Sequence, residues 1–228
     1  MFNKRHIVRT IAATVSILAL SFTAACGSGQ STASNSTDSD DITQQTYKPG
    51  KLTIATGQPA YEPWVMNDKP ESGEGYEAAV AYAVADKLGF KKSDVVWTRT
   101  AFDTAIAPGA KDWDFNIQQF GITDERKKAV DFSSSYYNDS QSVVVKKDSK
   151  FANATKVSDL KDATVGVMVG TLAYDYAKAN IKDDIQTFND DAALAQALDA
   201  GQIDALVTST VECVYICLLY TSPSPRDS

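Results

Sequence analysis

The sequence predicts an α/β fold in which helices alternate with the strands of mainly parallel sheets. Two kinds of pattern lead to this prediction. Short runs of β-branched residues, such as 164–169, are typical of buried strands, and they alternate with stretches such as 190–200, whose apolar residues recur with a helical period. Regular alternation of this kind is characteristic of α/β architecture. Ligands of open α/β sheets bind beyond the carboxyl ends of the strands, so the loops there are candidates for the site.

The first half of the chain gives clear beginnings and ends for its elements. Tyr76, Val80, Val84 and Leu88 recur every four residues and predict a helix that stops at Gly89. The expected strands are 51–56, 95–98 and 115–118, and the expected helices are 75–88, 102–107 and 123–129.

The second half continues the alternation up to about residue 208. Val143, Val144 and Val145 form an unbroken apolar run, which favours a strand buried on both faces. Ser158 is expected to cap a brief helical turn, and Leu194 is expected to point inward from its helix. The expected strands are 142–146, 164–169 and 203–207, and the expected helices are 172–180 and 190–200.

The N-terminal 26 residues are typical of a bacterial lipoprotein signal peptide. A positive segment with Lys4, Arg5 and Arg9 precedes the apolar run 11–22, which ends in small residues before Cys26. Cleavage before Cys26 would leave its sulfur to carry a diacylglyceryl group with palmitate-type chains. Thr23 stands where lipoproteins usually have leucine, and an ordinary secretory signal with an incidental cysteine is the alternative. Residues 27–46 are polar throughout and are expected to form a flexible tether.

The C-terminal residues 210–228 differ in character from the rest. The string from Cys217 to Ser228 resembles translated sequencing adapter, so we expect a non-native tail and exclude it from the fold prediction. A natural disordered tail is the alternative.

Composition restricts the possible functions. The chain has 22 basic and 29 acidic residues; without the three basic residues of the signal, 19 remain and the net charge is −10. No basic stripe for nucleic acid is present, and this charge favours a soluble monomer. The only histidine, His6, lies in the signal, and no cysteine lies between Cys26 and Cys213. We therefore expect no cofactor, no metal site and no His-based or Cys-based catalysis.

The segment around Arg126 is the most informative part of the chain. Thr123 is a natural helix N-cap, and Arg126 follows it in the first turn. A cation at the positive end of a helix is unfavourable unless an anion compensates it. The guanidinium group is suited to a carboxylate held by two hydrogen bonds. Pairing with a nearby acid such as Asp131 is the alternative, and spacing does not decide between the two.

Motifs across residues 51–208 resemble those of the family 3 solute-binding proteins, which serve polar amino acid ABC importers. The motifs, in chain order, are Tyr61-x-Pro63-Trp64, Gly75-Tyr76-Glu77, Phe102-Asp103, Ile122-Thr123-x-x-Arg126, Val130-Asp131-Phe132-Ser133, Tyr136-Tyr137, Val165-Gly166-Val167 with Gly170-Thr171, and Gly201-x-Ile203-Asp204-Ala205. The resemblance implies a type II periplasmic-binding-protein clamp with lobe 1 at 47–138 and an incomplete lobe 2 at 139–209. The C-terminal part that would complete both lobes is expected to be missing.

The resemblance also implies roles for individual residues. Arg126 would hold the α-carboxylate of an amino acid, with help from the Gly121 N–H and from Thr171. A carbonyl of Gln119 would accept from the ammonium or a side-chain group, and Tyr61 and Phe102 would stack on the ligand body, although either aromatic could instead be core. Glu77 is interpreted as an acid that favours the start of its helix.

One departure from the family pattern concerns Ser209, which stands where relatives often carry the aspartate that holds the ammonium. The function expected is a lipid-anchored binding protein on the outer face of the cytoplasmic membrane, with a polar amino acid as the expected ligand and an ABC permease as partner. A dehydratase-type enzyme and a ligand sensor on the same fold are the alternatives.

Overall fold

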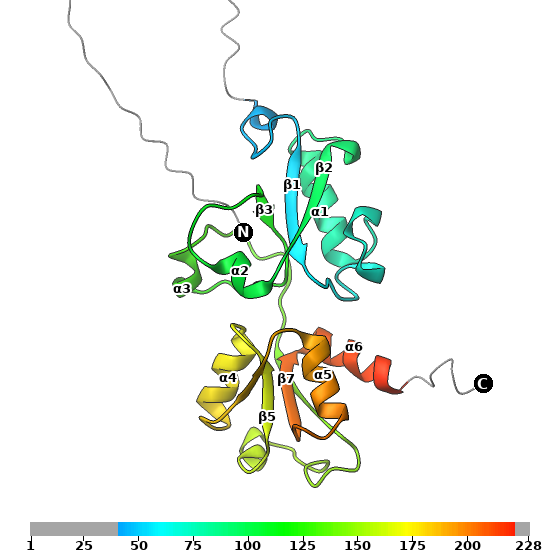
Figure 1. Cartoon of the computed structure of the whole chain (residues 1–228), viewed down its shortest axis with the longest axis vertical. Coiled ribbons are helices and arrows are strands. Elements are labelled where there is room, and N and C mark those ends of the chain that lie inside the picture. Colours follow the sequence, from blue (N-terminus) through cyan, green and yellow to red (C-terminus); the bar gives the residue numbers. More distant parts are fainter. Residues whose placement is uncertain (1–40, 222–228) are drawn as a thin grey trace, which may run out of the picture.

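Two separate sheets organise residues 41–221, which are the residues that the computed structural model describes (Figure 1). One sheet has three strands in the order β2-β1-β3, and the other has four strands in the order β4-β7-β5-β6. Each sheet forms a lobe with its own helices, which confirms the predicted two-lobed α/β architecture. The predicted signal peptide, Cys26 and residues 222–228 lie outside the described residues, and the predicted domain boundaries stay predictions.

The first lobe is built around β1, which pairs in parallel with strands on both sides. Its elements are β1 (Leu52–Gly57), β2 (Val95–Thr100), β3 (Phe115–Asn116), α1 (Tyr76–Lys87), α2 (Phe102–Ile106), α3 (Asp124–Lys127) and 3₁₀ turns at Ile42–Gln44, Met66–Asp68, Pro70–Ser72 and Lys92–Asp94. The first of these turns lies within the segment that we expected to be a tether. Leu52 and Ile54 of β1 are buried against Ala81 and Ala85 of α1.

Helix α1 begins at a position that only glycine can occupy. Gly75, its N-cap, has φ 102°, and a Cβ atom there would lie 2.5 Å from the Trp64 carbonyl oxygen. The backbone N–H of Glu77 donates to that same carbonyl at 3.0 Å. The tight start therefore brings Glu77 into the interior of the lobe, where its side chain is 0% exposed.

The second lobe has a mixed sheet. Its elements are β4 (Gln141–Val145), β5 (Val165–Met168), β6 (Gln186–Phe188), β7 (Ala205–Ser209), α4 (Leu172–Asn180), α5 (Asp191–Asp199), α6 (Thr210–Thr221) and a 3₁₀ turn at Val157–Leu160. Strand β5 is parallel to β6 and β7, whereas β4 is antiparallel to β7. Helix α6 lies within the predicted non-native tail, and its Ile216 packs in the core of this lobe.

Two sequence predictions for the second lobe were wrong, and one strand was missed. Residues 143–145 are only half-buried, because β4 is an edge strand of the sheet. The N-cap of the 3₁₀ turn is Lys156, whose backbone N–H donates to Asp159 Oδ2 at 3.1 Å, and Ser158 lies inside the turn. Strand β6 was not predicted, because its three residues are largely exposed and show no apolar pattern.

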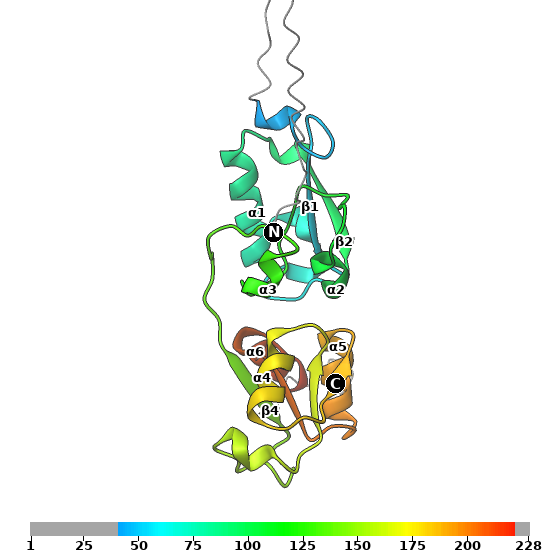
Figure 2. The same ribbon diagram turned by 90° about the vertical axis from the view of Figure 1, so that its left-hand side faces the viewer.

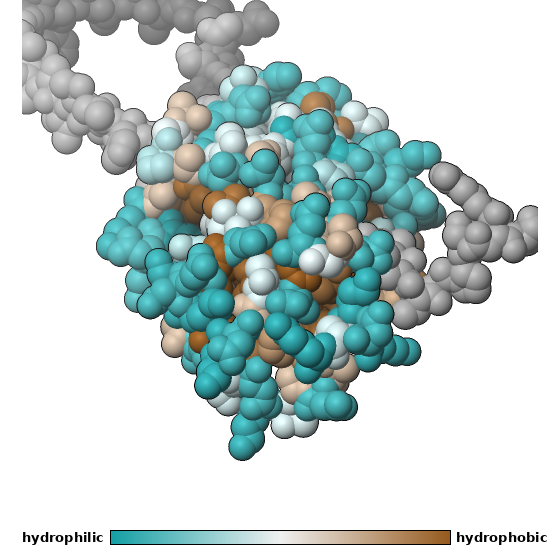
Figure 3. Space-filling model, turned by 60° about the horizontal axis from the view of Figure 1, so that its bottom comes forward, coloured by the Kyte–Doolittle hydropathy of each residue, from teal (hydrophilic) through white to brown (hydrophobic). Residues whose placement is uncertain are grey.

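The hydrophobic clusters are confined to single lobes. Among the described residues, the clusters around Ile54, Ala55 and Ala60 contain only first-lobe residues, and those around Val167 and Leu206 contain only second-lobe residues. From the end of the second lobe, mostly hydrophilic residues are visible, with hydrophobic ones showing between them (Figure 3). No helix among residues 41–221 has both the length and the apolar character needed to cross a membrane.

Residues 133–140 connect the lobes without forming a helix or a strand, and Figure 2 shows them as the green trace beside the gap between the lobes. Tyr136 and Tyr137 of this connection pack against the first lobe. The Tyr137 ring is 5.1 Å from the Trp64 ring, and the Tyr136 ring is 6.4 Å from the Tyr76 ring. The Tyr76 hydroxyl also donates to the Tyr136 carbonyl at 2.7 Å. The start of the connection is therefore fixed to the first lobe.

Candidate ligand-binding site

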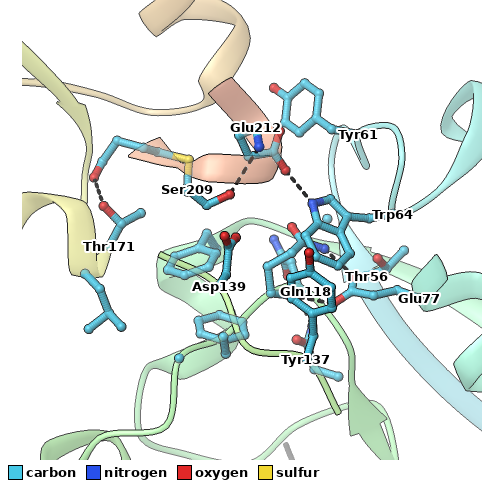
Figure 4. Close-up of a pocket in the computed structure, with 18 of the residues that line it drawn as sticks. Thr56, Tyr61, Trp64, Glu77, Gln118, Tyr137, Asp139, Thr171, Ser209 and Glu212 are labelled. Atoms are coloured by element: carbon cyan, nitrogen blue, oxygen red, sulfur yellow. Dashed lines mark hydrogen bonds between the residues drawn. The ribbon is translucent and has the colours of Figure 1, made fainter. Parts of the chain in front are cut away.

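A cavity of about 580 Å³ lies between the two lobes and is lined by residues of both. The first lobe contributes the ends of β1 and β3 with the loops that follow them, and the second contributes the starts of α4 and α5 and the end of β7. Figure 4 shows Thr56 and Trp64 from the first lobe on the opposite side of this space from Thr171 and Ser209 of the second. The cavity thus lies at the strand ends, as expected for α/β sheets.

All six ligand-binding residues predicted from the sequence line this cavity; they are Tyr61, Phe102, Gln119, Gly121, Arg126 and Thr171. Their contacts with a ligand stay predictions, because the structure holds none. Their contacts with the protein show how each side chain is positioned.

Arg126 is held by contacts from both lobes. Its Nη1 donates to the Gly121 carbonyl at 2.8 Å, and its Nη2 donates across the cavity to the Gly170 carbonyl at 2.9 Å. The guanidinium carbon lies 5.6 Å from the Phe102 ring centre and 5.4 Å from that of Phe120. Burial lowers the pKa of Arg126, but arginine remains charged in proteins.

The helix start at Arg126 agrees with the sequence prediction. The Thr123 hydroxyl accepts from the Arg126 backbone N–H at 3.1 Å, so Thr123 is the N-cap of α3. Among residues 41–221, Arg126 forms no salt bridge, and the alternative of an ion pair with Asp131 is therefore not what the structure shows. Its guanidinium group contacts carbonyl oxygens instead.

Gly121 and Leu172 face each other across the cavity at very short range. A Cβ atom on Gly121 would lie 2.3 Å from Leu172 Cδ1, so a larger residue requires the two lobes to move apart or Leu172 to change rotamer. The glycine and the leucine therefore form a matched pair across the lobes.

We predict that Gly121→Ala weakens ligand binding and that a second substitution, Leu172→Ala, restores it. Overpacking of this kind costs about 1–3 kcal/mol, and here the cost applies to the closed arrangement of the lobes. Calorimetric titration of the single and double variants measures the effect as a double-mutant cycle. If Gly121→Ala and the double variant Gly121→Ala/Leu172→Ala bind the ligand with equal affinity, the contact between positions 121 and 172 does not limit closure.

Gln119 is fixed by the buried carboxylate of Glu77. Its backbone adopts φ 52°, and its N–H donates to Glu77 Oε1 at 2.8 Å. The Gln119 side-chain amide donates to Glu77 Oε2, and the Tyr136 hydroxyl donates to Glu77 Oε1. Burial raises the pKa of Glu77, which opposes ionisation, while the three donors favour the charged form.

The sequence interpretation of Glu77 as no more than a helix-start acid was therefore incomplete. The residue does lie in the first turn of α1, but it also lines the cavity and joins Gln119 to the connection between the lobes. The motif Gly75-Tyr76-Glu77 was the available signal. Its partners lie 42 and 59 residues away in the sequence, so spacing could not identify them.

Tyr61 and Thr171 use their hydroxyl groups for structural contacts. The Tyr61 hydroxyl accepts from the backbone N–H of Ala192, at the start of α5 in the other lobe, at 3.2 Å. Thr171 caps α4 by accepting from the Tyr174 N–H at 3.3 Å, and it donates to the Met168 carbonyl at 2.8 Å. The predicted carboxylate contact of Thr171 would thus have to use its backbone N–H.

Two further acids line the second-lobe side of the cavity, and sequence reasoning missed both. Glu212 is 5% exposed and accepts from Trp64 Nε1 at 2.7 Å, a contact between the lobes that Figure 4 shows. Burial raises the pKa of Glu212 to about 8. Asp191, the first residue of α5, has a pKa that burial raises to about 6. Ser209 accepts from the Glu212 N–H at 3.2 Å.

Comparison with known proteins assigns the chain that forms this cavity to a family. Residues 52–197 match the model of the bacterial extracellular solute-binding proteins, family 3. The chain belongs to this family. The family 3 assignment confirms the resemblance that its motifs indicated, and it agrees with the two-lobed fold.

Relatives and solved structures of family 3 agree with this assignment. The chain is 33% identical to the L-cystine-binding protein TcyJ of Escherichia coli over 64% of its length, and 32% identical to the glutamine-binding protein of Geobacillus stearothermophilus over 90%. It spans 54% of the former and 82% of the latter. An ancestral arginine-binding protein bound to arginine superimposes with a TM-score of 0.64 at 32% identity, over 75% of this chain and 76% of that one.

The chain spans only part of several relatives, including 62% of the L-arginine-binding protein of Pseudomonas aeruginosa, to which it is 29% identical over 72% of its own length. An ancestral amino acid-binding protein described as a precursor of cyclohexadienyl dehydratase is similar as well, with a TM-score of 0.65 at 33% identity and 75% of each chain covered. Among residues 41–221, no group of His, Cys, Asp and Glu side chains is arranged to hold a metal ion.

Proposed function

We propose that this family 3 protein binds a polar amino acid in the cavity between its lobes and delivers it to an ABC importer. The observation that carries the proposal is the position of Arg126. Among the described residues that line the cavity, it is the only one with a cationic side chain. A cavity of about 580 Å³ is within the usual range for small-molecule sites.

The contacts of Arg126 suit a carboxylate ligand. A guanidinium group has five N–H donors, and the two described hydrogen bonds to carbonyl oxygens leave donors for an anion. The Gly121 backbone N–H, Phe102 and Tyr61 line the same cavity and would complete the contacts to the carboxylate and to the body of the amino acid. Because Arg126 contacts both lobes, a ligand bound to it would favour the closed arrangement.

Names of relatives support an amino acid as the ligand, since they bind cystine, glutamine or arginine. A screen of the purified chain against the twenty amino acids and cystine by thermal shift tests the proposal. A ligand present at 100 times its Kd stabilises a protein by about 2.7 kcal/mol, which is a shift of several degrees. A cooperative unfolding transition that none of these compounds shifts would contradict the proposal.

The proposed cellular arrangement follows from the N-terminal sequence. A lipid on Cys26 would hold the protein at the outer face of the cytoplasmic membrane, and residues 27–46 would give it reach to a permease. The protein would act there as a monomer, without nucleic acid partners and without catalysis.

We predict that Cys26→Ser moves the protein from the membrane fraction to the soluble fraction of producing cells. The wild-type chain should incorporate labelled palmitate, and the variant should not. Serine keeps the size of the side chain and removes the acylated sulfur, so it is a conservative change. Membrane association that is unchanged in the variant would contradict the lipid anchor.

A further inference from the structure

Asp191 is a carboxylate in the binding cavity without a cationic partner. It lines the cavity from the start of α5, and among residues 41–221 no lysine or arginine forms a salt bridge with it. Its recorded hydrogen bond is a long one, 3.4 Å from the Thr208 hydroxyl to Oδ1. Neighbouring Asp190 differs, because its Oδ1 accepts from the Ala193 N–H at 2.8 Å and caps the helix.

Asp191 is half-buried, and a carboxylate that is partly shielded from water and has no counter-ion is unfavourable. The surroundings of Asp191 nevertheless favour its charged form over that of Glu212, the buried acid nearby. As the first residue of α5, Asp191 lies at the positive end of a nine-residue helix. Since burial raises the pKa of Asp191 to about 6 and that of Glu212 to about 8, Asp191 is the ionised member of this pair at neutral pH.

We propose that Asp191 is a ligand-binding residue that pairs with a primary ammonium group of the bound amino acid. This inference rests on the proposed function. Arg126 and Asp191 then provide a cationic and an anionic contact that together recognise a zwitterion. Among the described residues, four other acids line the cavity, of which Glu77, Asp190 and Glu212 already accept hydrogen bonds of 2.7–2.8 Å from other residues, and Asp139 accepts from the Ser140 N–H at 2.8 Å. The ammonium would supply the counter-ion that Asp191 lacks in the unliganded protein. The ammonium can be the α-amino group or a side-chain amino group, and both have the same chemistry.

Asp191→Asn tests the inference, with L-glutamine and L-lysine as probes. Asparagine has nearly the same shape but no charge, so affinity for the bound probe should fall at least tenfold. Glutaramate, which is glutamine without its α-amino group, should bind equally to wild type and variant if the α-ammonium is the partner. Nε-acetyl-lysine, whose side-chain nitrogen carries no charge, should bind equally to wild type and variant if a side-chain ammonium is the partner.

Asp199→Asn is the matched control, because it makes the same charge change at the far end of the same helix, where Asp199 is exposed. It should bind both probes like the wild type. The unfolding temperature of the Asp191→Asn variant should be equal to or above that of the wild type, since a partly desolvated charge without a counter-ion is removed. Lost binding together with a lowered unfolding temperature would indicate a structural role and overturn the inference.

Binding should also depend on pH in a way that the variant lacks. A carboxyl group with a pKa of about 6 is protonated below that pH and loses its attraction for an ammonium, so affinity should be roughly tenfold lower at pH 5 than at pH 7.5. The other titratable groups near Asp191 are Asp190, Tyr61, Glu212 and Cys213. Glu212, with a pKa of about 8, stays neutral through most of this window.

The outcomes separate this inference from the proposed function. A wild-type chain that binds no amino acid would contradict both the proposed function and the role of Asp191. A wild-type chain that binds a probe, with an Asp191→Asn variant of equal affinity, would overturn the role of Asp191 alone. The role of Asp191 would also be overturned if Asp191→Asn lost as much affinity for glutaramate as for L-glutamine, and as much for Nε-acetyl-lysine as for L-lysine. The ammonium would not then be the group that Asp191 recognises.

Discussion

Replacing Arg126 by alanine is expected to weaken amino acid binding at least tenfold. Removing one partner of a buried, hydrogen-bonded charge pair costs about 2–5 kcal/mol, and Arg126 is the only cation among the described residues that line the cavity. The contact with the Gly170 carbonyl of the second lobe is lost as well. Calorimetric titration with the amino acid found in the thermal-shift screen measures the change.

Arg126→Lys distinguishes the charge of Arg126 from its shape. A lysine keeps the charge but has a single ammonium group, which cannot replace the planar guanidinium in its contacts with two carbonyls and a carboxylate. We therefore expect lysine to restore little of the affinity. Lys128→Ala, which removes an exposed cation that pairs with exposed Glu125, is the control and should leave binding unchanged. An affinity that stays near wild type in Arg126→Ala would exclude Arg126 from the site.

Replacing Glu77 by leucine is expected to lower both stability and ligand affinity. The change leaves the Gln119 N–H, the Gln119 amide and the Tyr136 hydroxyl without their acceptor. A fully buried donor left unsatisfied costs roughly 1–3 kcal/mol; Gln119 and Tyr136 are partly exposed to water, so each loss should be at the lower end of this range, and the costs do not simply add. Urea unfolding of the unliganded protein measures the loss of stability, and titration measures the loss of affinity.

Glu77→Gln distinguishes the effect of losing the hydrogen bonds to Glu77 from the effect of losing its charge. Glutamine keeps one acceptor oxygen, and a rotated Gln119 amide can pair with its new N–H₂ group, so the loss should be smaller than with leucine. Glu74→Gln, at an exposed position just before α1, is the matched control. A leucine variant that unfolds at the same urea concentration as the wild type would show that the three hydrogen bonds contribute nothing to stability.

Local signals predicted much of the fold and the position of the cation. Helix periods and caps depend on residues close in the sequence, so the helix at 172–180 and the N-cap at Thr123 were predicted from spacing. Arg126 was singled out because its position in a helix is locally unfavourable, a conflict that a functional contact can explain. The other five candidate site residues, by contrast, came from the family resemblance.

Features that depend on long-range pairing were not predictable in this way. The half-buried state of residues 143–145 depends on β4 being an edge strand, and only the order of the strands reveals that. Glu77 and Asp191 are acids that a hydrophobicity pattern places on the surface. Glu77 is buried and Asp191 half-buried because of residues distant in the sequence, such as Tyr136 for Glu77 and Thr208 for Asp191.

The confinement of each hydrophobic cluster to one lobe bears on how such a protein can change during evolution. Within residues 41–221, the apolar packing of each lobe involves no residue of the other, so cavity residues outside these clusters, such as Tyr61 and Phe102, can be replaced without disturbing either core. Relatives named for cystine, glutamine and arginine, at 29–33% identity, are consistent with such freedom. Selection for a new nutrient can thus act on a few cleft positions while the inherited scaffold keeps folding.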